Sequence, residues 1–115
     1  MKVIEIGNKA YEIKFTINTL VRMEEDGIDI MHMENLMNNM NFALIRKLFY
    51  YGLINSAGKS LTVNKAGDMM DEYLQENSYK DLMNVLLSEL ARSLGYDVDA
   101  KEQQEAGEAD EEAGK

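Results

Sequence analysis

Apolar and polar residues alternate along the first fifteen positions of the chain, which is typical of a strand with one covered face. Residues 7–10, Gly-Asn-Lys-Ala, supply turn chemistry in the middle of this stretch, and Glu12 and Lys14 are expected to face water. The pattern predicts a β-hairpin over residues 3–15. Because an isolated hairpin is marginal in water, its apolar face requires a helix or a second copy to cover it. The residues that we expect to support self-association through this hairpin are Val3, Ile4, Ile6, Tyr11 and Ile13.

Helical spacing of apolar residues replaces the alternation after residue 16. The expected N-caps are Thr16, Asn41, Thr62 and Ser78, the last forming a capping box with Asp81. Gly27 and Gly95 suit the left-handed conformation that often ends a helix. The predicted fold is α+β and mainly α: the hairpin is followed by a compact bundle of about five helices. They are expected to start at residues 17, 31, 42, 63 and 79, with a loop at residues 55–60.

The apolar faces of these helices differ in width. The first helix is expected to place Ile17, Leu20 and Val21 on one side, together with Glu24. The third is apolar almost all round, so it is either buried in its own domain or covered by a partner. The fifth carries one continuous apolar stripe that Gly95 ends.

The excess negative charge is concentrated at the C-terminal end. The chain has a net charge of −9, and residues 97–115 carry eight acids against two bases. Apart from Val98, that segment has no large apolar residue to bury, so we expect it to be a disordered acidic tail. Residues 1–96 are expected to form one folded domain. The absence of a basic stripe disfavours nucleic-acid binding. No apolar run is long enough to cross a membrane, and the alternating N-terminus lacks the pattern of a signal peptide, which favours a cytoplasmic location.

The residues suited to catalysis are few. The chain has no cysteine and a single histidine, His32, which has no acid or hydroxyl nearby in sequence to orient it. Gly52, Gly58, Lys59 and Ser60 superficially resemble a phosphate-binding loop, but the glycines are one residue too far apart and follow a predicted helix. The acids at residues 97–99 lack the spacing of a calcium loop. We therefore expect neither an enzyme nor a bound cofactor or metal.

Nine methionines gather mainly on the predicted helix faces. They could be core filler, or they could form an adaptable apolar groove, because an unbranched thioether accommodates more than one partner. The aromatic residues after Leu48 are open to the same two interpretations: core packing or an interface anchor. On the second interpretation, the candidate protein-binding residues are Met33, Met37, Met40, Phe49, Tyr50, Met69 and Met70.

Three segments together resemble the tail assembly chaperones of long-tailed, siphophage-type bacteriophages and gene transfer agents. The first is the extended segment that ends in Phe15-Thr16-Ile17-Asn18-Thr19-Leu20, with an acidic helix end at Glu24-Glu25. The second is Ile45-Arg46-Lys47-Leu48-Phe49-Tyr50-Tyr51-Gly52-Leu53, and the third is Leu61-Thr62 followed by Ala66-Gly67 and Asp71. The resemblance covers residues 3–95. The family often has tryptophan near the position of Tyr50, and this chain has none.

The resemblance implies a non-enzymatic protein that coats the tape-measure protein before the tail tube assembles around it. The expected partners are the tape-measure protein, with the tail tube protein as a further candidate, and further copies of the same chain. The resemblance also implies that the protein acts in the cytoplasm of the bacterial host and is absent from the mature virion. The alternative is a small acidic adaptor or inhibitor that binds another protein.

Overall fold

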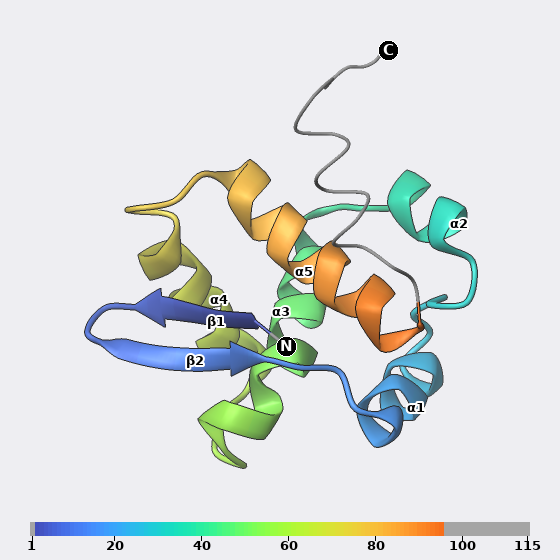
Figure 1. Ribbon diagram of the computed structural model, residues 1–115, viewed down its shortest axis with the longest axis horizontal. Helices are drawn as coiled ribbons and strands as arrows, with labels where there is room; N and C mark the ends of the chain where they lie inside the picture. The colour runs from blue at the N-terminus through green and yellow to red at the C-terminus, as the bar shows by residue number, and fades with distance from the viewer. Residues whose placement is uncertain (1, 96–115) are drawn as a thin grey trace.

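The computed structural model describes residues 2–95 and has the predicted architecture, an antiparallel hairpin followed by five helices. In Figure 1 the hairpin lies in front of α3 and α4, α5 runs diagonally past α3, and α1 and α2 lie at the opposite end from the hairpin turn. The predicted tail lies outside the described residues. The elements are β1 (Lys2–Ile6), β2 (Lys9–Ile13), α1 (Ile17–Glu25), α2 (Met33–Asn38), α3 (Phe42–Ala57), α4 (Val63–Tyr73) and α5 (Tyr79–Ser93).

The hairpin closes through a two-residue loop. Ile6 pairs with Lys9, so only Gly7 and Asn8 form the turn, and Lys9 and Ala10 belong to β2 rather than to the predicted four-residue turn. Gly7 has a φ of 64°, which a two-residue hairpin turn requires at this position and glycine adopts without strain. The apolar residues of alternate positions then face the helices: Ile4, Ile6, Ile13 and Phe15 are buried.

Local capping chemistry sets the ends of most helices. The side chains of Thr16, Asn41, Thr62 and Ser78 each accept a hydrogen bond from a backbone N–H in the first turn of the helix that follows. The predicted capping box of Ser78 and Asp81 is present in both directions. These contacts satisfy donors that a helix N-terminus otherwise leaves unpaired, which explains why four of the five helices begin where the sequence predicts.

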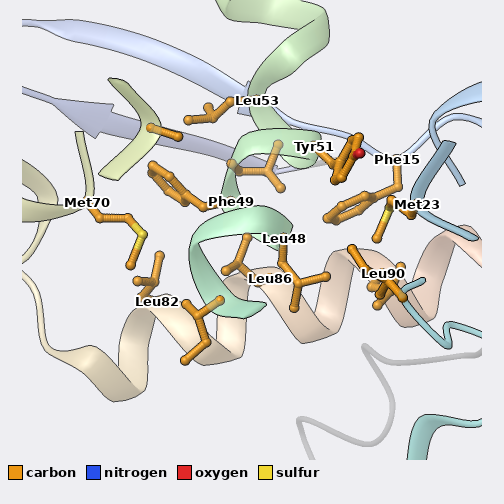
Figure 2. Packing of buried hydrophobic residues seen from close by; sticks show 14 of the residues in the cluster. Phe15, Met23, Leu48, Phe49, Tyr51, Leu53, Met70, Leu82, Leu86 and Leu90 are labelled. Carbon is orange, nitrogen blue, oxygen red and sulfur yellow. The ribbon is translucent and has the colours of Figure 1, made fainter. Parts of the chain in front are cut away.

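Helix α3 is the centre of the domain. Its side chains at Ile45, Leu48, Phe49 and Leu53 are at most 1% exposed, and they are covered by the domain itself. Figure 2 shows Phe49, Leu48 and Leu53 of α3 between the strands on one side and Leu82, Leu86 and Leu90 of α5 on the other. The third helix is therefore internal, which settles the alternative that the sequence left open.

Strand β2 approaches α3 closely at Gly52. A Cβ atom there would lie 3.1 Å from Ile13 Cγ2 and 3.2 Å from Phe15 Cζ. The backbone N–H of Lys14 also donates to the Gly52 carbonyl at 2.9 Å. The absence of a side chain at this position lets the strand pass directly over the helix.

Three details of the predicted helices were wrong. Helix α3 continues through Asn55 and Ser56, which were expected to form a loop, and ends at Gly58 with a φ of 96°. Helix α2 was expected to start at residue 31, but it starts at Met33. Its N-cap position is His32, whose side chain makes no capping hydrogen bond. The buried face of α1 is formed by Thr19, Leu20 and Met23, whereas Ile17 and Val21 are exposed.

Candidate protein-binding surface

The segment around α2 has few buried residues. Of the six residues of α2, only Leu36 is buried. Ile28 and Ile30 anchor the connection that precedes it. Among the five described helices, α2 alone lacks a side-chain N-cap, and it is the shortest. A helix with one anchor and no cap is expected to have low local stability.

Four methionines belong to this segment, and we call them the α2 methionines: Met31, Met33, Met37 and Met40. Met31 is 64% exposed and Met37 is 49% exposed. Met33 and Met40 are half-buried and pack against the core cluster. The segment therefore presents two large apolar side chains to solvent and keeps two more at the edge of the core, where a small change in α2 would expose them.

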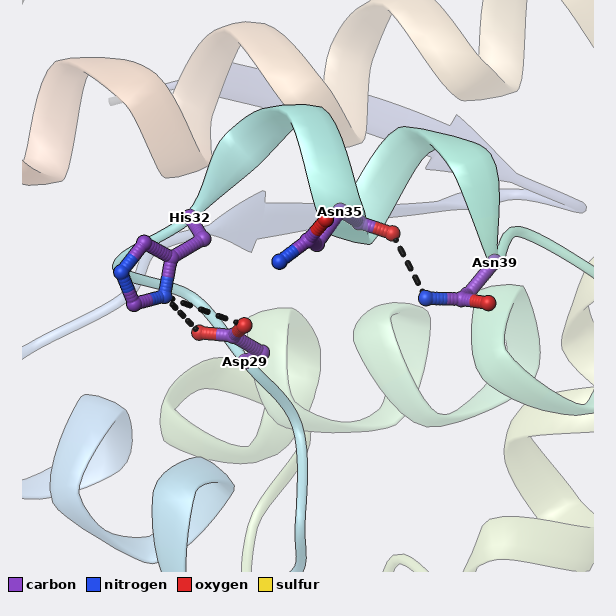
Figure 3. A network of polar contacts seen from close by, with 4 residues as sticks. All are labelled: Asp29, His32, Asn35 and Asn39. Atoms are coloured by element: carbon purple, nitrogen blue, oxygen red, sulfur yellow. Dashed lines mark hydrogen bonds and ion pairs between the residues drawn. The ribbon is translucent and has the colours of Figure 1, made fainter.

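Polar contacts lie at both ends of α2. The Nδ1 atom of His32 lies 2.9 Å and 3.1 Å from the two carboxylate oxygens of Asp29, and the side-chain amide of Asn39 donates to the Asn35 carbonyl at 2.9 Å (Figure 3). The hydrogen bond with His32 lowers the pKa of the Asp29 carboxyl below its usual value. The expectation that His32 has no acid nearby in sequence was wrong, because Asp29 is three residues away on the chain.

A second exposed apolar feature lies where α3 and α5 begin. Phe42 is 72% exposed and Tyr79 is 43% exposed, and their rings meet edge to face with centroids 5.6 Å apart. Edge-to-face contact is a favourable geometry for two aromatic rings. Both residues are the first of their helix, and neither was among the candidate binding residues. The pattern of apolar residues alone did not show that they are exposed.

The candidate protein-binding residues lie in three different environments. Phe49 is fully buried and Met70 is nearly so. Tyr50 and Met69 are half-buried, as are Met33 and Met40, and of the seven only Met37 is exposed. The structure does not gather them into one surface: α2, α3 and α4 each hold some of them. Phe49 and Met70 are packing residues in this conformation, because a partner could not reach their side chains without opening the core.

The hairpin residues divide in the same way. Ile4, Ile6 and Ile13 face the helices and are buried, so the helices cover the apolar face that sequence analysis left open to a helix or a second copy. Tyr11 is half-buried against the same cluster. Val3 is on the other face and is 60% exposed. Of this group, Val3 has the most exposed side chain.

A polar network fixes the segment between α1 and α2 to the core helix. Asp26, the residue after α1, accepts a hydrogen bond from the Tyr51 hydroxyl at 3.1 Å and forms an ion pair with the Lys47 ammonium at 3.3 Å. Burial of the Tyr51 ring, and then its hydrogen bond to Asp26, raise the pKa of Tyr51 above its usual value. Both partners of Asp26 are on α3, so the network sets where the chain leaves α1.

One buried carboxylate was also missed from the sequence. Glu89 of α5 is only 3% exposed, and one of its carboxylate oxygens lies 3.3 Å from the Nε atom of Arg92. Glu89 is three residues after Leu86 and directly precedes Leu90, so it lies on the buried face of α5. Its charge had suggested an exposed position.

Within residues 2–95, no three histidine, aspartate or glutamate side chains are arranged to hold a metal ion. None of the described helices combines the length and apolar character needed to cross a membrane. Comparisons with protein-family models, with curated protein sequences and with solved structures find no match.

Proposed function

We propose that this chain is a tail assembly chaperone that binds the tape-measure protein of a long-tailed phage and keeps it soluble during tail assembly. The protein would act in the cytoplasm of the bacterial host, without catalysis, and would leave before the virion is complete. The observation that carries the proposal is the exposure of Met31 and Met37 in the α2 segment. Within α2, Leu36 is the one buried residue that holds the helix against the core.

The packing of the resembling segments supports the fold part of the proposal. Phe15 of the first segment lies against Gly52 of the second, and Arg46 of the second lies against Gly67 of the third. The Cδ atom of Arg46 is 3.0 Å from where a Gly67 Cβ would be. The residues that carry the resemblance are thus mutual packing partners. They support a shared fold, whereas binding depends on exposed residues elsewhere.

The chemistry of the α2 methionines supports the binding part. A tape-measure protein is long and helical, and its apolar stripes are exposed until the tube forms. Methionine side chains are flexible and polarisable, so one set of them fits many different apolar stripes. Such a surface binds an amphipathic helix through the apolar face of that helix. It therefore does not need a specific polar contact at each position along the partner. Weak local attachment of α2 allows it to adjust to each stretch of the partner.

The test is co-expression with the tape-measure protein from the same gene cluster, followed by a solubility assay and a pull-down. The informative variant replaces both exposed α2 methionines, Met31→Ser with Met37→Ser. The matched control replaces two exposed apolar residues of α1, Ile17→Ser with Val21→Ser. All four side chains are exposed, so both double variants are expected to keep the wild-type thermal midpoint.

We expect the wild type and the α1 variant to keep the tape-measure protein soluble in a complex. With the α2 variant, we expect the tape-measure protein to precipitate and the complex to be absent from the pull-down. If the tape-measure protein precipitates equally with and without the wild-type chain, the chaperone proposal is wrong. An adaptor that binds another protein then becomes the better proposal. If both double variants still bind, the protein is a chaperone but its binding surface is not the α2 segment.

A further inference from the structure

The two edges of the hairpin are not equivalent, because α3 covers only one of them. The Glu12 backbone N–H donates to Ser56 Oγ at 3.1 Å, and the same hydroxyl donates to the Glu12 carbonyl at 3.1 Å. Lys14 donates to the Gly52 carbonyl on the same side. The outer edge of β2 therefore has partners on α3.

The same contacts determine which residues of β1 point outward. Glu12 directs both of its backbone groups away from β1, so the Val3–Glu12 pair is a non-hydrogen-bonded pair of the antiparallel ladder. Two residues further along, Glu5 faces Ala10 in the same way. The backbone N–H and C=O groups of Val3 and Glu5 thus point to the outer edge of β1. No described residue makes a hydrogen bond with them.

We propose that this edge of β1 pairs with β1 of a second copy of the chain, in antiparallel orientation, to form a continuous four-stranded sheet. Such an interface is self-complementary, and its two-fold axis lies midway between the Ile4 residues of the two copies. In this arrangement Val3 faces Glu5 of the other copy and Glu5 faces Val3. The two copies then exchange four backbone hydrogen bonds, and the exposed edge is removed. The inference concerns the second copy alone and does not depend on the proposed function.

The register follows from the outward groups and the charges. Within β1, Lys2–Ile6, only Val3 and Glu5 offer backbone groups to the edge. Val3 can therefore face Val3, Val3 can face Glu5, or Glu5 can face Glu5. The first arrangement leaves the outward groups of Glu5 without a partner among the described residues of the other copy. The third places two like charges directly opposite each other, which is destabilising. The mixed register alone uses both residues on both strands.

Charge complementarity favours a second copy as the occupant of this edge. In the mixed register, Lys2 faces Ile6 of the other copy, one residue from Gly7. The Glu72 carboxylate lies against Gly7, because a Cβ there would be 2.7 Å from Glu72 Oε2. Lys2 of one copy therefore comes close to Glu72 of the other. Within one chain the two cannot meet, since five residues of strand separate Lys2 from Gly7 by roughly 17 Å.

A cysteine mixing experiment tests both the pairing and its register, since the wild-type chain has no cysteine. Val3→Cys and Glu5→Cys are made as separate full-length variants and exposed to oxidised glutathione singly and as an equimolar mixture. Facing residues of a strand pair are close enough for a disulfide, and their side chains lie on the exposed face of the hairpin. We expect cross-linked dimers in the mixture, made of one chain of each kind, and far fewer when either variant is oxidised alone.

The strength of the pairing is measured by sedimentation across a concentration series. Val3→Pro removes an outward N–H that the hairpin does not use, so the monomer remains folded while dimerisation weakens by about tenfold or more. Val3→Thr, which keeps the N–H and the branched side chain, is the matched control and retains dimerisation. Lys2→Glu weakens the dimer, and adding Glu72→Lys restores it.

Two outcomes would overturn the inference. One is a wild-type chain that stays monomeric up to millimolar concentration while the cysteine mixture gives no mixed dimer. The other is an oligomer that Val3→Pro leaves intact, which would place self-association on a different surface. Circular dichroism of each variant confirms that the hairpin and helices are folded. A chain that fails to dimerise but still keeps the tape-measure protein soluble would refute this inference and leave the proposed function standing.

Discussion

Replacing Gly52 with alanine tests the packing of β2 on α3 directly. The added methyl group would lie 3.1 Å from Ile13 Cγ2 and 3.2 Å from Phe15 Cζ, closer than ordinary carbon–carbon contact. Ile13 is fully buried and Phe15 is 4% exposed, so neither side chain can move into solvent. The strand must instead move away from the helix, which would lengthen the 2.9 Å hydrogen bond from Lys14 to the Gly52 carbonyl.

Two opposing effects set the size of the change. Alanine is favoured over glycine inside a helix by about 1 kcal/mol. Overpacking of a rigid core site costs about 1–3 kcal/mol, and weakening the Lys14 bond costs up to about 1 kcal/mol more. We expect Gly52→Ala to lower the free energy of unfolding by about 1–2 kcal/mol. Each kcal/mol corresponds to a fall of about 4–8 °C in Tm for a domain of this size.

Gly67 provides the matched control, because it also lies within a helix. The nearest atom to an added Cβ there is Arg46 Cδ at 3.0 Å, in the middle of a long, half-exposed side chain that can adjust. Gly67→Ala should therefore be neutral or more stable by up to about 1 kcal/mol. Urea unfolding followed by circular dichroism measures both variants. A Gly52→Ala protein as stable as the wild type would refute the packing argument, and so would equal losses at the two sites.

Three further predictions concern named side chains. Phe49→Asp should leave no cooperative unfolding transition by circular dichroism, because it places a carboxylate at a fully buried site; a folded monomer would show that α3 is not internal. The raised pKa of Tyr51 means that the folded state holds this proton more tightly than the unfolded state, so its contribution to stability is present below about pH 10 and is lost above it. Tyr51→Phe should therefore lose less stability than the wild type between about pH 9 and 11 in urea titrations, and an identical loss would contradict the assignment. His32→Ala should raise the pKa of Asp29 toward its ordinary value in an NMR titration, with an unchanged Tm; an unmoved pKa would mean that the contact with His32 does not form in solution.

The sequence predicted the elements of this fold well where local chemistry determines them. Thr16, Asn41, Thr62 and Ser78 cap the helices that follow because each oxygen reaches a backbone N–H within the same turn. The bounds of α2 were wrong because His32 makes no such contact. Where no side chain marks the boundary, the end of a helix depends on tertiary packing, which the sequence pattern does not contain.

Which apolar stripe of a helix is buried was harder to predict. Helix α1 has two sets of apolar residues, and the structure buries Leu20 and Met23 while Ile17 and Val21 remain exposed. Met23 was not assigned to the buried side, although it is fully buried. Spacing identifies possible faces, but the choice between them depends on how α1 is held, here by Asp26 bonded to α3. The Asp29–His32 contact, by contrast, follows from a three-residue separation and could have been predicted.

The burial of α3 has a consequence for any binding activity. Because the domain covers its own most apolar helix, binding must depend on the few large side chains that remain exposed, among them Met31, Met37 and Phe42. A small set of exposed residues gives weak binding per copy, since only well-packed central contacts contribute strongly. A protein that coats a long partner then needs several linked copies, whose combined binding exceeds that of each one. Pairing through β1 would link two copies without using any of these side chains, so the α2 methionines of both would remain available.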